Sequence, residues 1–137
     1  MYVNYPEIVD ACDVLFANCY PFWEGQSVPE AIENVISGYY YIKSLYPNQE
    51  IVITETGWVT KSNHAHAQSD IASEDNQKIF NSVIDKWAEK NKITCFFFEA
   101  FDEPWKGSTD PFEPEKHWGY YDVYRKPKSI KRSRQII

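Results

Sequence analysis

The sequence has few cysteines, few glycines and no long apolar run. Its three cysteines, Cys12, Cys19 and Cys95, are an odd number without metal-site spacing, so we expect buried thiols rather than metal ligands. No run approaches the ~20 apolar residues of a membrane span, and residues 1–10 show no basic region followed by an apolar one. Because no low-complexity linker divides the chain, we predict a single domain over residues 1–137.

An excess of positive charge is also missing. The net charge is −6, with a pI near 5.0, which argues against nucleic acid or an anionic membrane as partner and is compatible with a neutral polymer. His64 and His66 have no acid or cysteine at a supporting spacing, so we expect solvated loop histidines rather than a metal site. The basic residues near the end predict a solvated terminal helix; they are Lys126, Lys128, Lys131, Arg132 and Arg134.

What the chain does have is an alternation of apolar runs and amphipathic stripes. Short apolar runs predict strands over 14–18, 51–55 and 93–98, after a short helix over 5–11. Between the strands, the capping-box pattern of Ser27 and Glu30 opens one helix, and Ser73 is a cap for a second, whose stripe includes Phe80 and Trp87 as core residues. The order β-α-β-α-β and the nearly continuous apolar strands predict a parallel α/β sheet covered by helices, with right-handed crossovers.

Acids and aromatic residues follow each predicted strand. The segments 18–23, 55–58 and 99–105 are expected to share the rim at the carboxyl ends of the strands, where β/α barrels carry their active sites. Glu55 leaves a buried strand there, so its carboxylate must be exposed in a cleft, paired, for example with Lys61, or used in chemistry. Carboxylates beside aromatic rings suit the oxocarbenium-like transition state of glycoside hydrolysis.

Two further acids in the last of these segments allow more than one interpretation. Glu103 and Lys106 could form a charge pair that holds sugar hydroxyls, or an ordinary solvated ion pair. Glu99 could support the site or be an inward charge satisfied by hydrogen bonds, and the sequence does not distinguish the two. The high aromatic content, 17% of residues, fits sugar-stacking platforms but also core filling.

Three motifs together resemble glycoside hydrolase family 17, the β-1,3-glucanases and related glucanosyltransferases. They are Ile53–Trp58 (ITETGW), Phe98–Lys106 (FEAFDEPWK) and His117–Gly119 (HWG), in this order. The resemblance implies a retaining (β/α)8 TIM barrel in which Glu55 is the nucleophile after strand seven. It also implies a β-glucan substrate, no metal and no organic cofactor, and an extracellular or cell-envelope location.

The resemblance assigns further residues around Glu55. Glu103, Lys106 and Glu115 would form a supporting cluster after strand eight, with Glu113 as a competitor for the place of Glu115. The residues expected to contact the glucan are Tyr20, Phe22, Trp58 and Trp105.

One departure from the family pattern concerns the second catalytic carboxyl group. The family's acid/base glutamate lies after strand four in a Gly-Asn-Glu type motif, and the sequence contains no such motif. We therefore expect the chain to hold strands six to eight of the barrel, to lack the first five, to be inactive alone and to leave both outer strands unpaired. The alternatives are another barrel glycosidase family, a non-catalytic glucan-binding module, and one half of a split enzyme completed by an N-terminal half-barrel chain.

Overall fold

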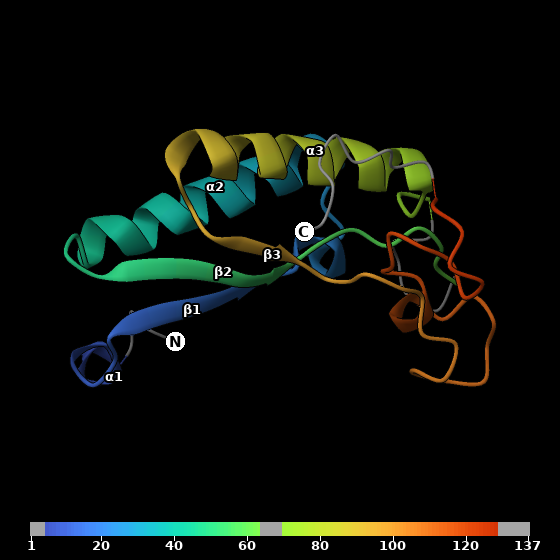
Figure 1. Ribbon diagram of the computed structural model, residues 1–137, viewed down its shortest axis with the longest axis horizontal. Coiled ribbons are helices and arrows are strands. Elements are labelled where there is room, and N and C mark those ends of the chain that lie inside the picture. The colour runs from blue at the N-terminus through green and yellow to red at the C-terminus, as the bar shows by residue number, and fades with distance from the viewer. Residues whose placement is uncertain (1–4, 64–69, 129–137) are drawn as a thin grey trace.

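Three parallel strands and two long helices form the body of the molecule (Figure 1). The computed structural model describes residues 5–63 and 70–128, so the predictions for His64, His66 and the terminal helix lie outside the described residues. The elements, in chain order, are α1 (Pro6–Asp10), β1 (Val14–Cys19), the 3-10 helix η1 (Pro21–Glu24), α2 (Val28–Leu45), β2 (Glu50–Thr56), α3 (Glu74–Asn91), β3 (Cys95–Phe97) and the 3-10 helix η2 (Pro114–Lys116).

Both long helices begin where the sequence predicts. At α2 the Glu30 carboxylate accepts hydrogen bonds from the N–H and the hydroxyl of Ser27, at 2.9 and 2.6 Å. At α3 the Ser73 hydroxyl accepts from the N–H of Asn76 at 3.1 Å. These side chains satisfy N–H groups that the first turn of a helix leaves without partners. None of the described helices is long and apolar enough to cross a membrane.

The sheet has the order β1-β2-β3, with β2 in the middle. The predicted β-α-β-α-β arrangement is therefore confirmed for the described residues. Within them, each outer strand pairs with β2 alone, as expected from the sequence. Such edges expose N–H and C=O groups that can pair with further strands.

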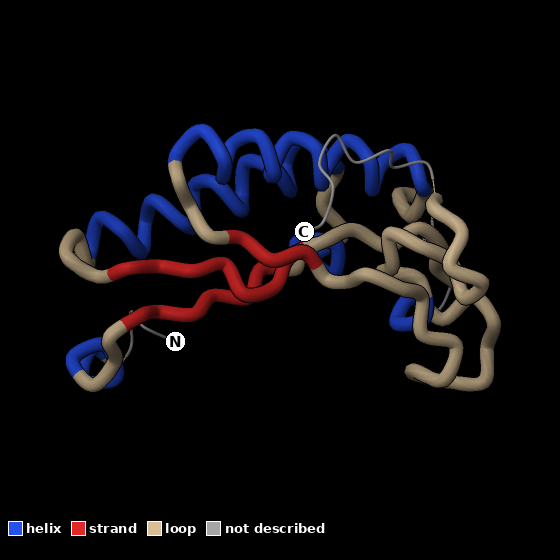
Figure 2. The backbone as a smooth tube through the Cα atoms, in the orientation of Figure 1, coloured by secondary structure: helices blue, strands red, loops and turns tan. Residues whose placement is uncertain are grey.

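The helices cover only one face of this sheet (Figure 2). That face carries the main core, in which Ile53 packs with Val35, Phe80 and Ile84, as predicted for Phe80. On the other face Phe16 and Phe96 remain 61% and 59% exposed. Both long helices of the described part lie on the core side, so the predicted cover of helices is present on one face of the sheet.

The three cysteines are free but only partly buried, which corrects the expectation of fully buried thiols. Burial still raises the pKa of Cys19 to about 11 and that of Cys95 to about 12, so both thiols stay protonated at neutral pH.

A β-bulge interrupts β2 just before its end. Ile53 pairs with Ala17 and Glu55 with Asn18, and on the other side Ile53 pairs with Cys95 and Thr56 with Phe97, so β2 carries one extra residue relative to both neighbours. Strict alternation would turn Glu55 to the face of Ile53, into the core beneath the helices. The extra residue gives that inward place to Thr56, which is fully buried, and leaves Glu55 half-buried at the strand end.

Candidate active site

The centre of the candidate site is a hydrogen bond between the ends of two neighbouring strands. Tyr20, directly after β1, donates its hydroxyl to Oε2 of Glu55 at 2.6 Å. Burial, then the hydrogen bond and charge of Glu55, raise the pKa of Tyr20 well above its usual value, so this hydroxyl remains a donor. Glu55 thus contacts Tyr20 rather than Lys61, the partner that the sequence offered as an alternative. Tyr20 itself is fixed edge-on against Phe98 and Trp118.

A second group of charges follows β3. Lys106 forms ion pairs with Glu103 and, at 3.6 Å, with Oε1 of Glu99, and its ammonium lies 4.3 Å from the centre of the Phe98 ring. Burial works against the charge of Lys106, but the hydrogen bond to Glu103 and the nearby carboxylates outweigh it and raise its pKa. The predicted pair of Glu103 and Lys106 is thus present. Glu99 joins it to form a partly buried cluster of three ionisable side chains.

Glu99 is the member of this cluster whose role the sequence leaves open. Its side chain is 16% exposed. Burial is the main cause that raises its pKa to about 7; Lys106 opposes the shift and Glu103 adds to it. The charge of Glu99 also acts on Tyr20, which places the cluster and the Tyr20–Glu55 pair in one electrostatic environment. Glu99 can therefore hold a proton at neutral pH beside the other carboxylates.

The structure separates the two glutamates that compete for the third place in the supporting cluster. Glu113 is buried and accepts a hydrogen bond from Ser108 at 3.0 Å, so it holds the loop that carries it. The charge of Glu115 acts on both Lys106 and Tyr20. Of the two glutamates, Glu115 is therefore the one whose charge reaches the cluster.

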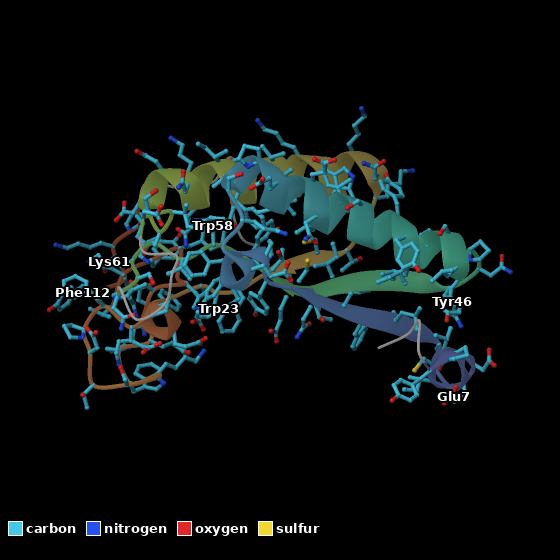
Figure 3. All side chains as sticks on the ribbon, turned by 180° about the vertical axis from the view of Figure 1, so that it is seen from behind. Glu7, Trp23, Tyr46, Trp58, Lys61 and Phe112 are labelled. Carbon is cyan, nitrogen blue, oxygen red and sulfur yellow. The ribbon has the colours of Figure 1, made fainter. Side chains whose placement is uncertain are left out.

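Two of the aromatic residues expected to contact the glucan are fully buried. Phe22 and Trp58 have no exposed surface and pack against each other with ring centres 5.4 Å apart. Trp58, which is labelled in Figure 3, also donates its indole N–H to the carbonyl of Ile71 at 3.0 Å. The prediction of direct contact is therefore wrong for these two rings, because Phe22 also packs against Trp118, and Trp58 against Phe80 of α3. They support the wall of the site from behind.

The remaining predicted aromatic residue, Trp105, is 74% exposed. It lies in the loop after β3, one residue before Lys106, and lines a hollow to which neither Glu55 nor Tyr20 contributes. Trp105 is thus available to a ligand, but in a hollow that includes neither Glu55 nor Tyr20.

Two polar residues that the sequence did not single out hold the site together. Gln77, on α3, is fully buried and donates its side-chain amide to the carbonyls of Trp58, Trp118 and Gly119 at 2.8, 3.0 and 3.3 Å. It joins the loop after β2 to the segment that follows η2. A polar residue on the apolar stripe of a helix is the only sequence signal for such a role.

Asp102 forms a buried ion pair with Lys128, whose ammonium lies 2.6 Å from Oδ1. The side chains are only 8% and 6% exposed, and Lys128 also donates to the Thr60 hydroxyl at 2.8 Å. Gly119 donates its N–H to the same carboxylate oxygen at 3.0 Å. The expectation that Lys128 is a solvated base is therefore wrong, since it is the buried partner of an acid beside Glu103.

We expect replacement of Glu99 by glutamine to change how stability depends on pH. The folded state holds the Glu99 proton up to a pH of about 7, whereas the unfolded chain releases it near the ordinary glutamate pKa of 4.5. Deprotonation then favours the unfolded state, so wild-type stability should fall between these two pH values relative to Glu99→Gln. Urea denaturation at pH 4.5 and 7.5 measures the difference.

The matched control for this experiment is Glu33→Gln, at an exposed position of α2. Glu103, Lys106 and Tyr20 face Glu99 and remain unchanged in both variants. Equal pH dependence of Glu99→Gln and Glu33→Gln would contradict a proton held on Glu99.

Comparison with known proteins supports the family indicated by the motifs. The family model described as the BtgE/BtgC glycoside hydrolase domain matches residues 1–119. A glucan 1,3-beta-glucosidase of Schizosaccharomyces pombe is 31% identical over 116 residues, which are 78% of this chain and 35% of that protein. A glucan 1,3-beta-glucosidase of Arthroderma benhamiae is 28% identical over 125 residues, 83% of this chain and 40% of that protein. The chain thus spans well under half the length of these curated relatives.

Solved structures agree with the sequence comparison. A glycoside hydrolase family 17 beta-1,3-glucanosyltransferase from Rhizomucor miehei superimposes with a TM-score of 0.80 at 28% identity, over 94% of this chain and 46% of that one. An active-site mutant of the Rhizomucor miehei beta-1,3-glucanosyltransferase, in complex with laminaritriose, gives a TM-score of 0.77 at 27% identity, over 89% and 43% of the two chains.

Proposed function

The chain belongs to the BtgE/BtgC glycoside hydrolase domain family, and we propose that it contributes the nucleophile half of a retaining active site that cleaves or transfers β-1,3-linked glucan. In this proposal β1, β2 and β3 correspond to strands six, seven and eight of a (β/α)8 barrel. The relatives are named for β-1,3-glucan chemistry, and one of the solved neighbours holds laminaritriose. These names support the choice of substrate.

The observation that carries the proposal is the presentation of Glu55. A bulge in β2 keeps its carboxylate out of the core, and the Tyr20 hydroxyl holds one of its oxygens at 2.6 Å. The other oxygen is left to approach a sugar carbon. A strand-end carboxylate that only capped a turn would need neither the bulge nor a half-buried tyrosine donor.

In the proposed reaction Glu55 attacks the anomeric carbon of the glucan. A bond forms between its free oxygen and the sugar carbon while the bond to the leaving sugar oxygen breaks, and that oxygen takes a proton from a general acid. Tyr20 orients the attacking carboxylate through the hydrogen bond. The charges of Glu99, Glu103, Lys106 and Glu115 offer acceptors and a donor to the hydroxyls of the bound sugar. No step requires a metal.

The general acid/base is the part of the reaction for which the sequence has no matching motif. A retaining glycosidase places its two carboxyl groups about 5–5.5 Å apart on opposite sides of the glycosidic bond. We assign the second carboxyl group to the strand-four position of the barrel, which these 137 residues do not include in the proposed correspondence. The nucleophile can therefore be tested separately from the acid.

We expect a slowly released glycosyl adduct to form on Glu55 when the leaving group needs no proton. A 2-deoxy-2-fluoro-laminaribioside of 2,4-dinitrophenol fits this requirement, because dinitrophenolate departs with its electron pair as Glu55 bonds to the sugar carbon. Digestion and mass spectrometry should find the added sugar on the peptide that contains Glu55.

Two variants control the labelling. Glu55→Gln should remain unlabelled, whereas Glu50→Gln, at the exposed start of the same strand, should label like wild type. Labelling of another residue, or no labelling of a chain that binds laminarioligosaccharides, would show that Glu55 is not the nucleophile.

A further inference from the structure

A second concavity lies beside the loop that follows β3. It has a volume of roughly 650 Å³, within the ~300–1,000 Å³ usual for small-ligand sites. Neither the Tyr20–Glu55 pair nor the cluster of Glu99, Glu103 and Lys106 contributes to its lining. Its lining combines apolar Pro104, Trp105, Pro111 and Val123 with polar residues that include Thr109, Lys116 and His117.

The loop around this hollow is held by a buried lysine. Lys116 is only 8% exposed, and its ammonium donates to the carbonyls of Pro104 and Lys106 at 2.8 and 2.6 Å. These two carbonyls flank Trp105 on either side in the chain. Lys116 thus fixes the backbone that carries the tryptophan, and a platform that is rigid before binding loses little entropy when a ligand arrives.

A buried glutamate holds the opposite part of the loop. Glu113 is 8% exposed and accepts the Ser108 hydroxyl at 3.0 Å. Gly107, with φ near +67°, leaves no room for a Cβ, which would overlap Cγ of Glu113. Burying charged side chains is costly unless they are paired or hydrogen-bonded. Here two of them, Lys116 and Glu113, stabilise the wall of the hollow rather than the main core.

Trp105 itself remains exposed on this rigid loop. An indole that is 74% exposed leaves a large apolar surface in water, which favours contact with an apolar ligand face. The hollow offers the Thr109 hydroxyl beside apolar Pro111 and Val123, whereas the Ser108 hydroxyl already donates to Glu113. None of its described lining residues is acidic, in a chain of net charge −6. A ring with one apolar face and neutral hydroxyls at its edge fits this lining.

We propose that this hollow is a second binding site for a β-linked gluco-oligosaccharide, with Trp105 as the stacking platform. The choice of a glucan rests on the proposed function, but the lining of this hollow includes neither Glu55 nor Tyr20. A smaller concavity of about 250 Å³ continues past Pro104, Trp105 and Val123. Because Trp105 lines both concavities, a ligand stacked on it borders both, and the site would hold one part of a glucan while another part of the same glucan reaches Glu55.

The test is a titration of the purified chain with laminarihexaose, followed by NMR of the indole N–H signals and of the Ser108 and Thr109 amides. Wild type should show shifts of the Trp105 indole, and Glu55→Ala should show the same shifts with a Kd unchanged within about twofold. Trp105→Ala should weaken the response of the Ser108 and Thr109 amides about tenfold or more, as truncation of a central aromatic contact does. Tyr124→Ala removes an aromatic side chain that is 78% exposed but lies outside the lining, and it should bind like wild type.

The outcomes separate this site from the proposed function. Shifts near Tyr20 and Glu55 without a response of Trp105 would overturn the second site but would agree with the proposed function at Glu55. Loss of the Trp105 shift in Glu55→Ala would show a single site and also overturn the inference. A response of neither region would contradict the glucan substrate itself, and with it both proposals.

Discussion

Lys128→Met is expected to destabilise the fold by about 3–5 kcal/mol, the usual cost of removing one partner from a buried ion pair. The variant would leave the carboxylate of Asp102 buried, with the Gly119 N–H but without the ammonium that lies 2.6 Å away in wild type. Burial acts against the charge of either partner, but the imidazole of His117, whose Nδ1 lies 3.7 Å from Oδ2, and the ammonium of Lys128 keep the pKa of Asp102 below its usual value. Guanidinium denaturation at pH 7 measures the loss.

Lys126→Met supplies the control, since Lys126 is exposed two residues earlier. A surface change of this kind usually alters stability by no more than about 0.5 kcal/mol. Adding Asp102→Asn to Lys128→Met should recover part of the loss, because the amide can still accept from Gly119 without a buried charge. If Lys128→Met and Lys126→Met were equally stable, the pair would have no structural role.

The second large effect concerns turnover of an unactivated substrate. The purified chain is expected to release no reducing ends from soluble β-1,3-glucan above the level of its Glu55→Gln variant. General acid catalysis contributes ~10²–10⁴-fold to such reactions, and a sugar leaving group without it departs very slowly. The contrast with the dinitrophenyl reagent matters, because that reagent tests the nucleophile without the acid.

Reducing-end assays over a day, with and without Glu55→Gln, provide the measurement. Turnover by wild type that Glu55→Gln abolishes would contradict the expectation and would mean that a carboxyl group within these 137 residues serves as the acid. Glu99 would then be the first candidate, since burial raises its pKa to about 7 and it can hold a proton to donate.

Features that depend on neighbouring residues in the sequence were predictable. The capping box at Ser27, the cap at Ser73 and the apolar stripe that includes Phe80 determine the two long helices, because capping and helical periodicity act over a few residues. The alternation of these helices with apolar runs also predicted the parallel sheet, whereas the central place of β2 comes from the structure. The order of helices and strands along the chain follows from local patterns, and it can therefore be predicted from the sequence.

Side-chain exposure in the site was not predictable in the same way. Phe22 and Trp58 resemble glucan-contacting aromatic residues in the sequence, but the fold buries them against each other and against Trp118 and Phe80. Trp105 resembles them equally and is exposed. The difference arises from which segments the fold brings on top of each ring, and those segments lie far along the chain.

The sequence by itself determined that an acid follows a buried strand at Glu55 and that a charge pair of Glu103 and Lys106 follows the next. Only the tertiary structure decided which way Glu55 turns, because the bulge in β2 is defined by the register against both neighbouring strands. Only the tertiary structure brought Tyr20 to Glu55, across 35 residues, and Lys128 to Asp102, across 26. The physical reason is that strand register and buried charge pairs are settled by contacts between distant segments, whereas propensity and pattern describe a residue and its near neighbours.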